Sequence, residues 1–172
     1  MLATVTDFYG ALAQISFTLL GLWWIVVQFK YQTLMRDRRR RIQAYDTSLY
    51  FVLPGIMSLI SLLSETGLLW RVTFATAAIL GVLEAIALLA FTRRVQGGRL
   101  WRLAHYAGCT LYLLVALFAV RPTVVANLGI DLETLQVEGV FLALIVFLGV
   151  QSTWLQFAAA DQAAGGRREM VG

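Results

Sequence analysis

The chain has 172 residues, a length typical of one domain, but its composition is not that of a soluble protein. Hydrophobic residues make up 59% of it and charged residues only 14%, whereas soluble domains carry roughly 25% charged residues. The charges gather in short segments between long apolar stretches, so too few remain to cover a surface that faces water. Despite the net charge of +4, this pattern excludes a soluble enzyme, a disordered chain and a nucleic-acid-binding protein. It predicts an all-α integral membrane protein.

Five apolar stretches are each long enough for a helix to cross a hydrocarbon layer about 30 Å thick. We expect all five to be transmembrane helices, because lipid offers no partner to unpaired backbone groups. They form a single transmembrane domain of residues 1–172. The helices are predicted at residues 8–29, 45–64, 68–91, 101–120 and 135–159, with connectors at 30–44 and 92–100, a loop at 121–134 and a tail at 160–172.

The basic residues predict how the chain is oriented in the membrane. Nearly all of the 14 Lys and Arg residues lie in or beside the two connectors and the tail, and only Arg71 and Arg121 lie on the opposite side. Because cytoplasmic loops are enriched in Lys and Arg, both connectors and the tail are predicted to be cytoplasmic. The N-terminus and the 121–134 loop are then outside and the C-terminus is cytoplasmic. Arginine greatly outnumbers lysine, which is typical of a GC-rich bacterial genome, so we expect a bacterial cytoplasmic membrane.

The first predicted helix carries a polar stripe. Asp7, Gln14, Gly21 and Gln28 recur every seven residues, and Thr18 shares their face at 100° per residue. Such a stripe is suited to line water in an oligomeric pore, where polar groups replace part of an ion's hydration shell. The alternative is helix packing, in which small residues allow a close approach and polar side chains hydrogen-bond across the contact.

One acidic residue, Glu84, lies inside the predicted third helix. A charge near the middle of the membrane costs about 2.5–3.5 kcal/mol, so we expect Glu84 to face protein or water, as a proton carrier or a cation site. The alternative is a neutral acid bonded to a hydroxyl. Because the third and fourth helices form a hairpin, Tyr112 should lie within about 3 Å of the depth of Glu84. A pairing of the Tyr112 hydroxyl with the Glu84 carboxyl is therefore predicted, with simple packing of Tyr112 as the alternative.

Other polar residues of the helices have plainer interpretations. A lone histidine, His105, lies near the cytoplasmic end of the fourth helix, and we expect it at the membrane interface. Glu138, Gly149, Ser152 and Gln156 share one side of the fifth helix, which favours packing between helices.

A basic run follows the first helix, interrupted by Asp37. It is predicted to contact anionic lipid headgroups at about 1 kcal/mol per basic residue. Its members are Arg36, Arg38, Arg39, Arg40 and Arg41. Binding to nucleic acid is not expected, because no aromatic residues are interleaved with the run in a folded module.

Enzymatic activity is not predicted. One histidine and one cysteine cannot build a multi-histidine metal site or a paired-histidine haem site within a chain. The sequence has no glycine-rich phosphate loop and no serine-hydrolase elbow. We therefore expect no catalytic residues, no metal and no cofactor.

Two functional hypotheses remain. The first is a homo-oligomeric channel or small permeation pathway for cations or protons, lined by the first helix, because five helices in one chain enclose little space. The second is a non-conducting accessory, assembly or sensor subunit that docks onto another membrane protein through the same polar faces.

Overall fold

The structure is a computed structural model that describes residues 2–31, 38–63, 67–92, 99–124 and 133–169. Within these residues it consists of five long helices, so the predicted all-α fold is confirmed. The helices are α1 (Leu2–Phe29), α3 (Arg38–Leu63), α4 (Gly67–Thr92), α5 (Arg99–Val120) and α7 (Thr134–Glu169). Four of them, namely α1, α3, α5 and α7, contain segments long and apolar enough to span a membrane. The chain is therefore an integral membrane protein.

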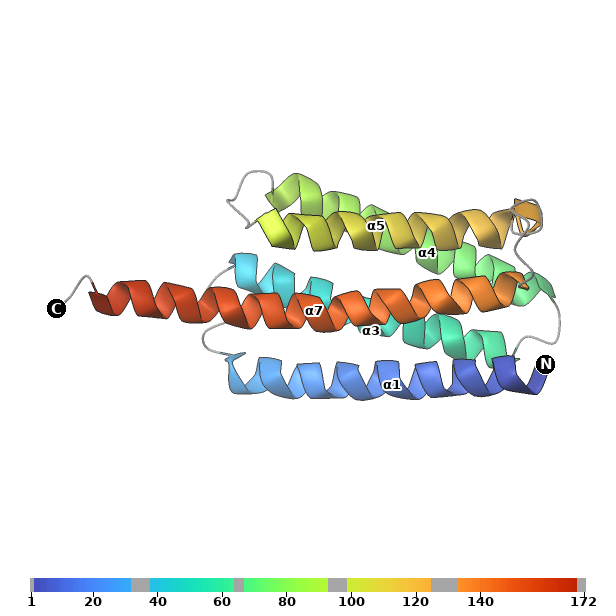
Figure 1. The fold of residues 1–172 in the computed structure, drawn as a ribbon, viewed down its shortest axis with the longest axis horizontal. Helices are drawn as coiled ribbons and strands as arrows, with labels where there is room; N and C mark the ends of the chain where they lie inside the picture. The colour runs from blue at the N-terminus through green and yellow to red at the C-terminus, as the bar shows by residue number, and fades with distance from the viewer. Residues whose placement is uncertain (1, 32–37, 64–66, 93–98, 125–132, 170–172) are drawn as a thin grey trace.

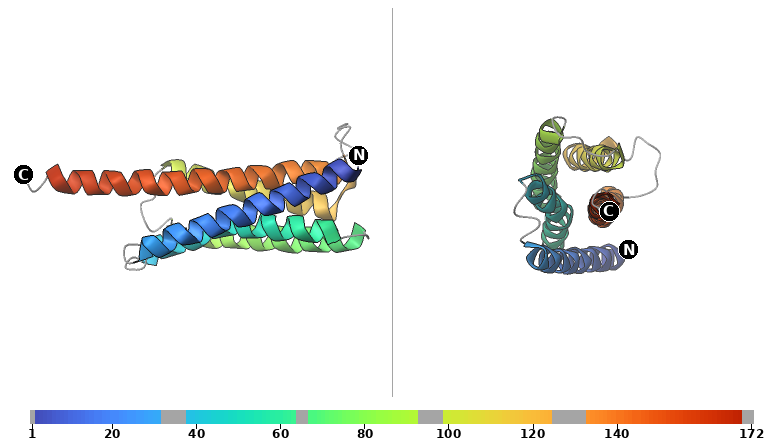
Figure 2. Two further views of the ribbon diagram at one scale, coloured as in Figure 1. Left: turned by 90° about the horizontal axis from the view of Figure 1, so that it is seen from below. Right: turned by 90° about the vertical axis from the view of Figure 1, so that its left-hand side faces the viewer.

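The helices lie side by side as one elongated bundle (Figure 1). Seen along its length, α1 lies on one edge of the bundle, and α4 and α5 lie on the opposite edge (Figure 2). The α3 helix packs against α1, α4 and α7, while α5 packs against α4 and α7. Among the described residues, α1 packs mainly against α3 and α7 and touches α4 at the Tyr9–Phe74 ring contact.

Several helices extend beyond the apolar stretches that predicted them. The α1 helix begins at Leu2 rather than at residue 8, and α3 begins at Arg38, inside the predicted connector 30–44. The α7 helix continues to Glu169, through most of the predicted tail 160–172. Hydropathy marks only the part of a helix that lies in hydrocarbon, whereas residues with good helix propensity, such as Ala and Arg, continue it into water.

The length of α7 shows this most clearly. Its 36 residues span roughly 54 Å at about 1.5 Å per residue, well beyond a hydrocarbon layer of about 30 Å. The C-terminal part of α7 accordingly projects past the other helices (Figure 1). Residues 32–37, 93–98 and 125–132, which fall in the predicted connectors and loop, lie outside the described residues.

The core consists of large side chains from all five helices. Phe74 of α4 is fully buried and makes edge-to-face contacts with Tyr9 of α1 and Trp70, with ring centroids 6.3 and 5.8 Å apart. Such aromatic pairs add about 0.5–1.5 kcal/mol beyond the burial of their area. On the outside, large apolar side chains such as Leu80 and Phe147 are exposed, as expected for a surface that faces lipid.

The α3 and α7 helices approach closely at Gly149, which is buried. A Cβ atom at Gly149 would lie only 2.7 Å from Cβ of Tyr50 and 2.8 Å from the ring of Phe51, so no larger residue fits without moving the helices apart. Further along the contact, the Gln156 amide donates a hydrogen bond of 2.6 Å to the Thr47 hydroxyl. The predicted packing role of Gly149 and Gln156 is therefore confirmed.

Candidate functional site

The α1 helix has two distinct faces. Its buried residues point toward the rest of the bundle, mainly α3 and α7. Among them, the Trp23 indole donates a hydrogen bond of 2.9 Å to the Ala44 carbonyl of α3. These buried residues are Tyr9, Leu12, Ala13, Ser16, Trp23 and Val27. The predicted polar stripe lies on the opposite side of the helix at 100° per residue. All of its members, Asp7, Gln14, Thr18, Gly21 and Gln28, are exposed in the single chain.

The glycines of the exposed face show how open it is. A Cβ atom at Gly10 or Gly21 would meet no atom within 4 Å. Close helix packing inside this chain therefore does not account for these two glycines. In the membrane, the groups that contact the stripe are therefore lipid, water or another polypeptide, and not the rest of the described bundle.

The cost of placing polar side chains in hydrocarbon favours contact of the stripe with water or with another protein. Gln14 and Thr18 lie near the middle of the span Thr4–Phe29, where an exposed polar side chain would face hydrocarbon. An amide that loses water without gaining a hydrogen bond costs roughly 2–7 kcal/mol, depending on the reference state. Water or a second protein removes this cost, whereas lipid does not.

A second polar group lies inside the bundle. His105 of α5 and Asp46 of α3 are both buried, and 3.4 Å separates His105 Nδ1 from Asp46 Oδ2. The side chain of His105 faces α3 and is buried between helices, so it does not point toward lipid headgroups; its depth in the membrane stays a prediction. The sequence interpretation also missed Asp46. Two signals could have found it, an acid near the start of an apolar run and a histidine at a matching distance from the end of another helix.

A small pocket opens beside this pair, between α3, α4 and α5. The volume of this pocket is close to the minimum needed to hold one water molecule. Its walls are formed by Asp46, Leu49, Tyr50, Leu53, Gly81, Glu84, Gly108 and Tyr112. The structure therefore brings Glu84 and Tyr112 to the same pocket. The Tyr112 hydroxyl, however, donates its hydrogen bond to the Leu49 carbonyl, at 3.4 Å, rather than to the Glu84 carboxyl as predicted.

Two glycines make room for the tyrosines of the pocket. A Cβ atom at Gly81 would lie 2.8 Å from the Tyr112 ring, and one at Gly108 would lie 2.6 Å from the Tyr50 hydroxyl. The rings therefore rest directly on the backbones of α4 and α5. This contact holds α3, α4 and α5 at a fixed spacing around Asp46.

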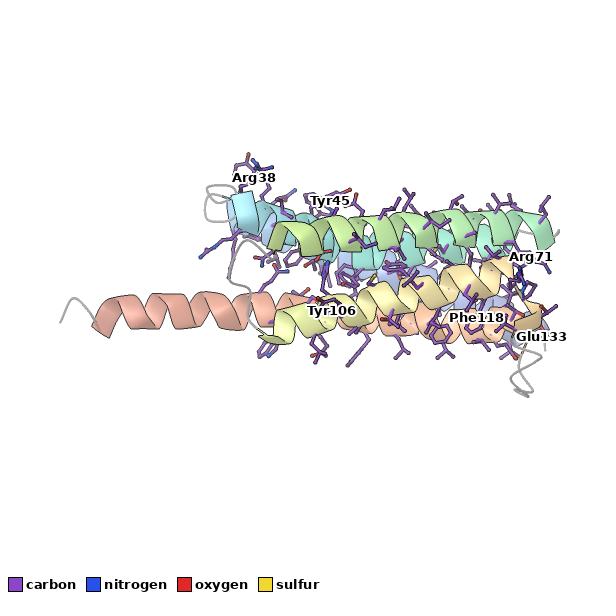
Figure 3. All side chains as sticks on the ribbon, turned by 90° about the horizontal axis from the view of Figure 1, so that it is seen from above. Arg38, Tyr45, Arg71, Tyr106, Phe118 and Glu133 are labelled. Carbon is purple, nitrogen blue, oxygen red and sulfur yellow. The ribbon has the colours of Figure 1, made fainter. Side chains whose placement is uncertain are left out.

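A third polar residue, Glu138, is buried near the start of α7. Among the described residues, neither of its carboxyl oxygens has a hydrogen-bond partner. The neighbouring Tyr9 hydroxyl donates its hydrogen bond to the Leu135 carbonyl instead, at 2.7 Å. Figure 3 shows Arg71 and Glu133 at this end of the bundle.

The basic run lies at the other end. Arg38 is located there in Figure 3, and Arg38 and Arg41 are exposed while Arg40 is partly exposed. Arg36 lies outside the described residues, as does the side chain of Arg39. The exposed arginines are placed where lipid headgroups could reach them, and this contact stays a prediction.

The described residues contain no group of three or more His, Cys, Asp or Glu side chains able to hold a metal ion. The chain was also compared with known proteins. No protein-family model matches it, and neither a curated protein nor a solved structure was found to be similar. The functional assignment therefore depends on the polar groups described above.

Proposed function

We propose that this protein is a subunit of a homo-oligomeric permeation pathway for cations or protons, lined by α1 of each copy. The observation that carries the proposal is the position of the polar stripe, which lies opposite the face by which α1 joins its own bundle. Copies arranged around an axis would turn Gln14, Thr18 and Gln28 toward a shared water-filled space. Asp7, at the start of the helix, would attract cations to its mouth.

The proposal includes five crossings of a bacterial cytoplasmic membrane. In this arrangement α4 also spans the membrane, the N-terminus lies outside, and the basic start of α3 meets the cytoplasmic headgroups. The antiparallel bundle and the arginines at one end support it. Partners are the bilayer, anionic lipid headgroups and further copies of the chain.

The open space at Gly10 and Gly21, on the exposed face of α1, favours a second candidate, a non-conducting subunit of a larger complex. In that case another membrane helix would pack on the small residues and bond to the glutamines. The two functions differ in what the purified protein does alone.

The test combines oligomeric state with flux. The protein is purified, its subunit number is measured by light scattering, and potassium and proton flux are recorded in liposomes. We expect an oligomer that conducts, and we expect Gln14→Leu to lower flux about tenfold, which corresponds to about 1.4 kcal/mol on the barrier. The matched control is Gln151→Leu, because Gln151 is an exposed glutamine of α7. It should conduct as the wild type does.

Other outcomes separate the alternatives. A stable monomer without flux would reject the pathway and support the accessory subunit. Equal flux in Gln14→Leu and wild type would reject α1 as its lining. A Glu84→Gln variant with unchanged flux would exclude Glu84 from permeation and leave the α1 pathway standing.

A further inference from the structure

The pocket between α3, α4 and α5 differs from the α1 stripe in position and chemistry. It lies within one chain, and its wall residues come from helices that do not include α1. Asp46, Glu84 and His105 each lie roughly 9–12 Å from a helix end at about 1.5 Å per residue. Those ends meet at one end of the bundle, where Tyr45 and Tyr106, the neighbours of Asp46 and His105, are labelled in Figure 3.

The charges around the pocket are not balanced by the Asp46–His105 pair alone. Glu84, from α4, is a second acid on the wall of a pocket with room for about one water molecule. Two carboxylates around so small a space repel each other unless a proton or a cation lies between them. A structural ion pair between α3 and α5 would not need Glu84.

The geometry favours a proton over a metal ion. Among the described residues, no three Asp, Glu, His or Cys side chains lie close enough together to hold a metal ion directly. A proton, by contrast, needs only one donor, one acceptor and a water molecule between them. The Tyr112 hydroxyl donates to the Leu49 carbonyl, and the hydroxyls of Tyr50 and Tyr112 are much weaker acids than carboxyl and imidazolium groups, so the two acids and the imidazole are the exchanging groups.

We propose that Asp46, His105 and Glu84 form a proton-binding site inside each subunit. One proton is shared among His105 Nδ1, Asp46 Oδ2 and the Glu84 carboxyl group, the last through a water molecule in the pocket. Only N–H and O–H bonds form and break, and net charge is conserved when the proton moves within the site. The site does not depend on whether α1 lines a pathway.

The surroundings of the site contain further groups that a titration experiment must consider. Two more helices, α1 and α7, pack against α3. The side chains with which they hydrogen-bond to α3, Trp23 of α1 and Gln156 of α7, are uncharged. The titratable groups that line the pocket are Asp46 and Tyr50 from α3, Glu84 from α4 and Tyr112 from α5. Two further groups of α5 lie beside the lining, His105 next to Asp46 and Cys109 near Tyr50. Tyrosine and cysteine titrate well above the range in which histidine does.

The chain offers a clean probe, because His105 is its only histidine. Protein labelled with ¹⁵N in the imidazole ring gives one set of histidine signals, which can be followed from about pH 5 to pH 9. The comparison uses wild type, Asp46→Asn and Glu84→Gln. Glu133→Gln is the matched control, since Glu133 is exposed at the opposite end of the bundle.

We expect Asp46→Asn to lower the proton affinity of His105 about tenfold or more, because the imidazolium loses its adjacent carboxylate. Glu84→Gln should lower it by a smaller but measurable factor, and Glu133→Gln should leave it unchanged. A His105 curve that is the same in Glu84→Gln and wild type would overturn the shared site. A histidine signal that does not respond to pH in the wild type would overturn it as well.

The Glu84→Gln comparison keeps the proposal testable if Asp46→Asn does not fold. Its readout is also separate from flux. The site can therefore be disproved while the α1 pathway stands, and the pathway can fail while the site is confirmed.

Discussion

Replacing Gly149 by alanine tests the contact between α3 and α7. The new Cβ atom would lie 2.7 Å from Cβ of Tyr50 and 2.8 Å from Cε1 of Phe51. The first of these atoms is fixed to the backbone of α3, so rotation of a side chain does not relieve the clash. The two helices would have to move apart by about 1 Å to reach normal carbon–carbon contact at roughly 3.5–4.0 Å.

The magnitude follows from two opposing effects. Overpacking of a core typically costs about 1–3 kcal/mol, while alanine gains up to about 1 kcal/mol over glycine in helix propensity. The expected net loss in the free energy of unfolding is about 1–2 kcal/mol. For a chain of this size that corresponds to a fall in Tm of roughly 3–6 °C.

The assay is thermal unfolding of the detergent-solubilised protein, followed by tryptophan fluorescence, because Trp23 and Trp70 are buried and report on the core. Gly10→Ala is the matched control, since a Cβ atom there meets nothing within 4 Å. It should unfold at the wild-type temperature or slightly above. If Gly149→Ala is as stable as Gly10→Ala, the close contact between α3 and α7 is incorrect.

Two further substitutions test hydrogen bonds between helices by the same unfolding assay. Trp23→Phe removes the indole donor to the Ala44 carbonyl and should cost about 1–3 kcal/mol, because a buried bond is lost; an unchanged Tm would argue against this link between α1 and α3. Gln156→Leu removes the amide that donates to Thr47 and should cost about 1 kcal/mol, with exposed Gln151→Leu as its control. Equal effects in the two leucine variants would contradict a specific bond at Gln156.

The apolar stretches predicted the helices well because crossing a bilayer requires about 20 apolar residues, which leaves a strong signal in one segment at a time. The helix ends were predicted less well. Arg38 begins α3 and Glu169 ends α7, since a backbone can remain helical where hydropathy has already fallen. The relative depth of Glu84 and Tyr112 could also be predicted, because both lie at a similar distance from the turn that joins their helices. Both residues line the same pocket.

Contacts across helices were harder to predict, because they depend on how two helices are rotated about their axes. His105 could face lipid or protein, and its matching distance from a helix end indicates the depth of Asp46 but not that the two side chains face each other. Trp23 illustrates the same point. Its position near the end of α1 is typical of an interfacial tryptophan, yet its ring is buried and bonds to α3.

The polar stripe of α1 could be recognised from its spacing, but the direction it faces could not. A stripe of Gln and Gly is equally compatible with packing inside the chain and with an outward face. The structure resolves this choice, because the opposite side of α1 carries the residues that pack on the bundle. What the stripe contacts in the membrane, another copy of the chain, water or lipid, is thus the central question about function.

Cross-linking in the native membrane answers that question most directly. In a Cys109→Ala background, Gln14→Cys places a single thiol on the stripe, and Leu144→Cys places one on the exposed face of α7. With a short bifunctional maleimide, we expect linked dimers for Gln14→Cys and monomers for Leu144→Cys. Monomers at both positions, or equal linkage at both, would contradict the claim that α1 faces another copy of the chain.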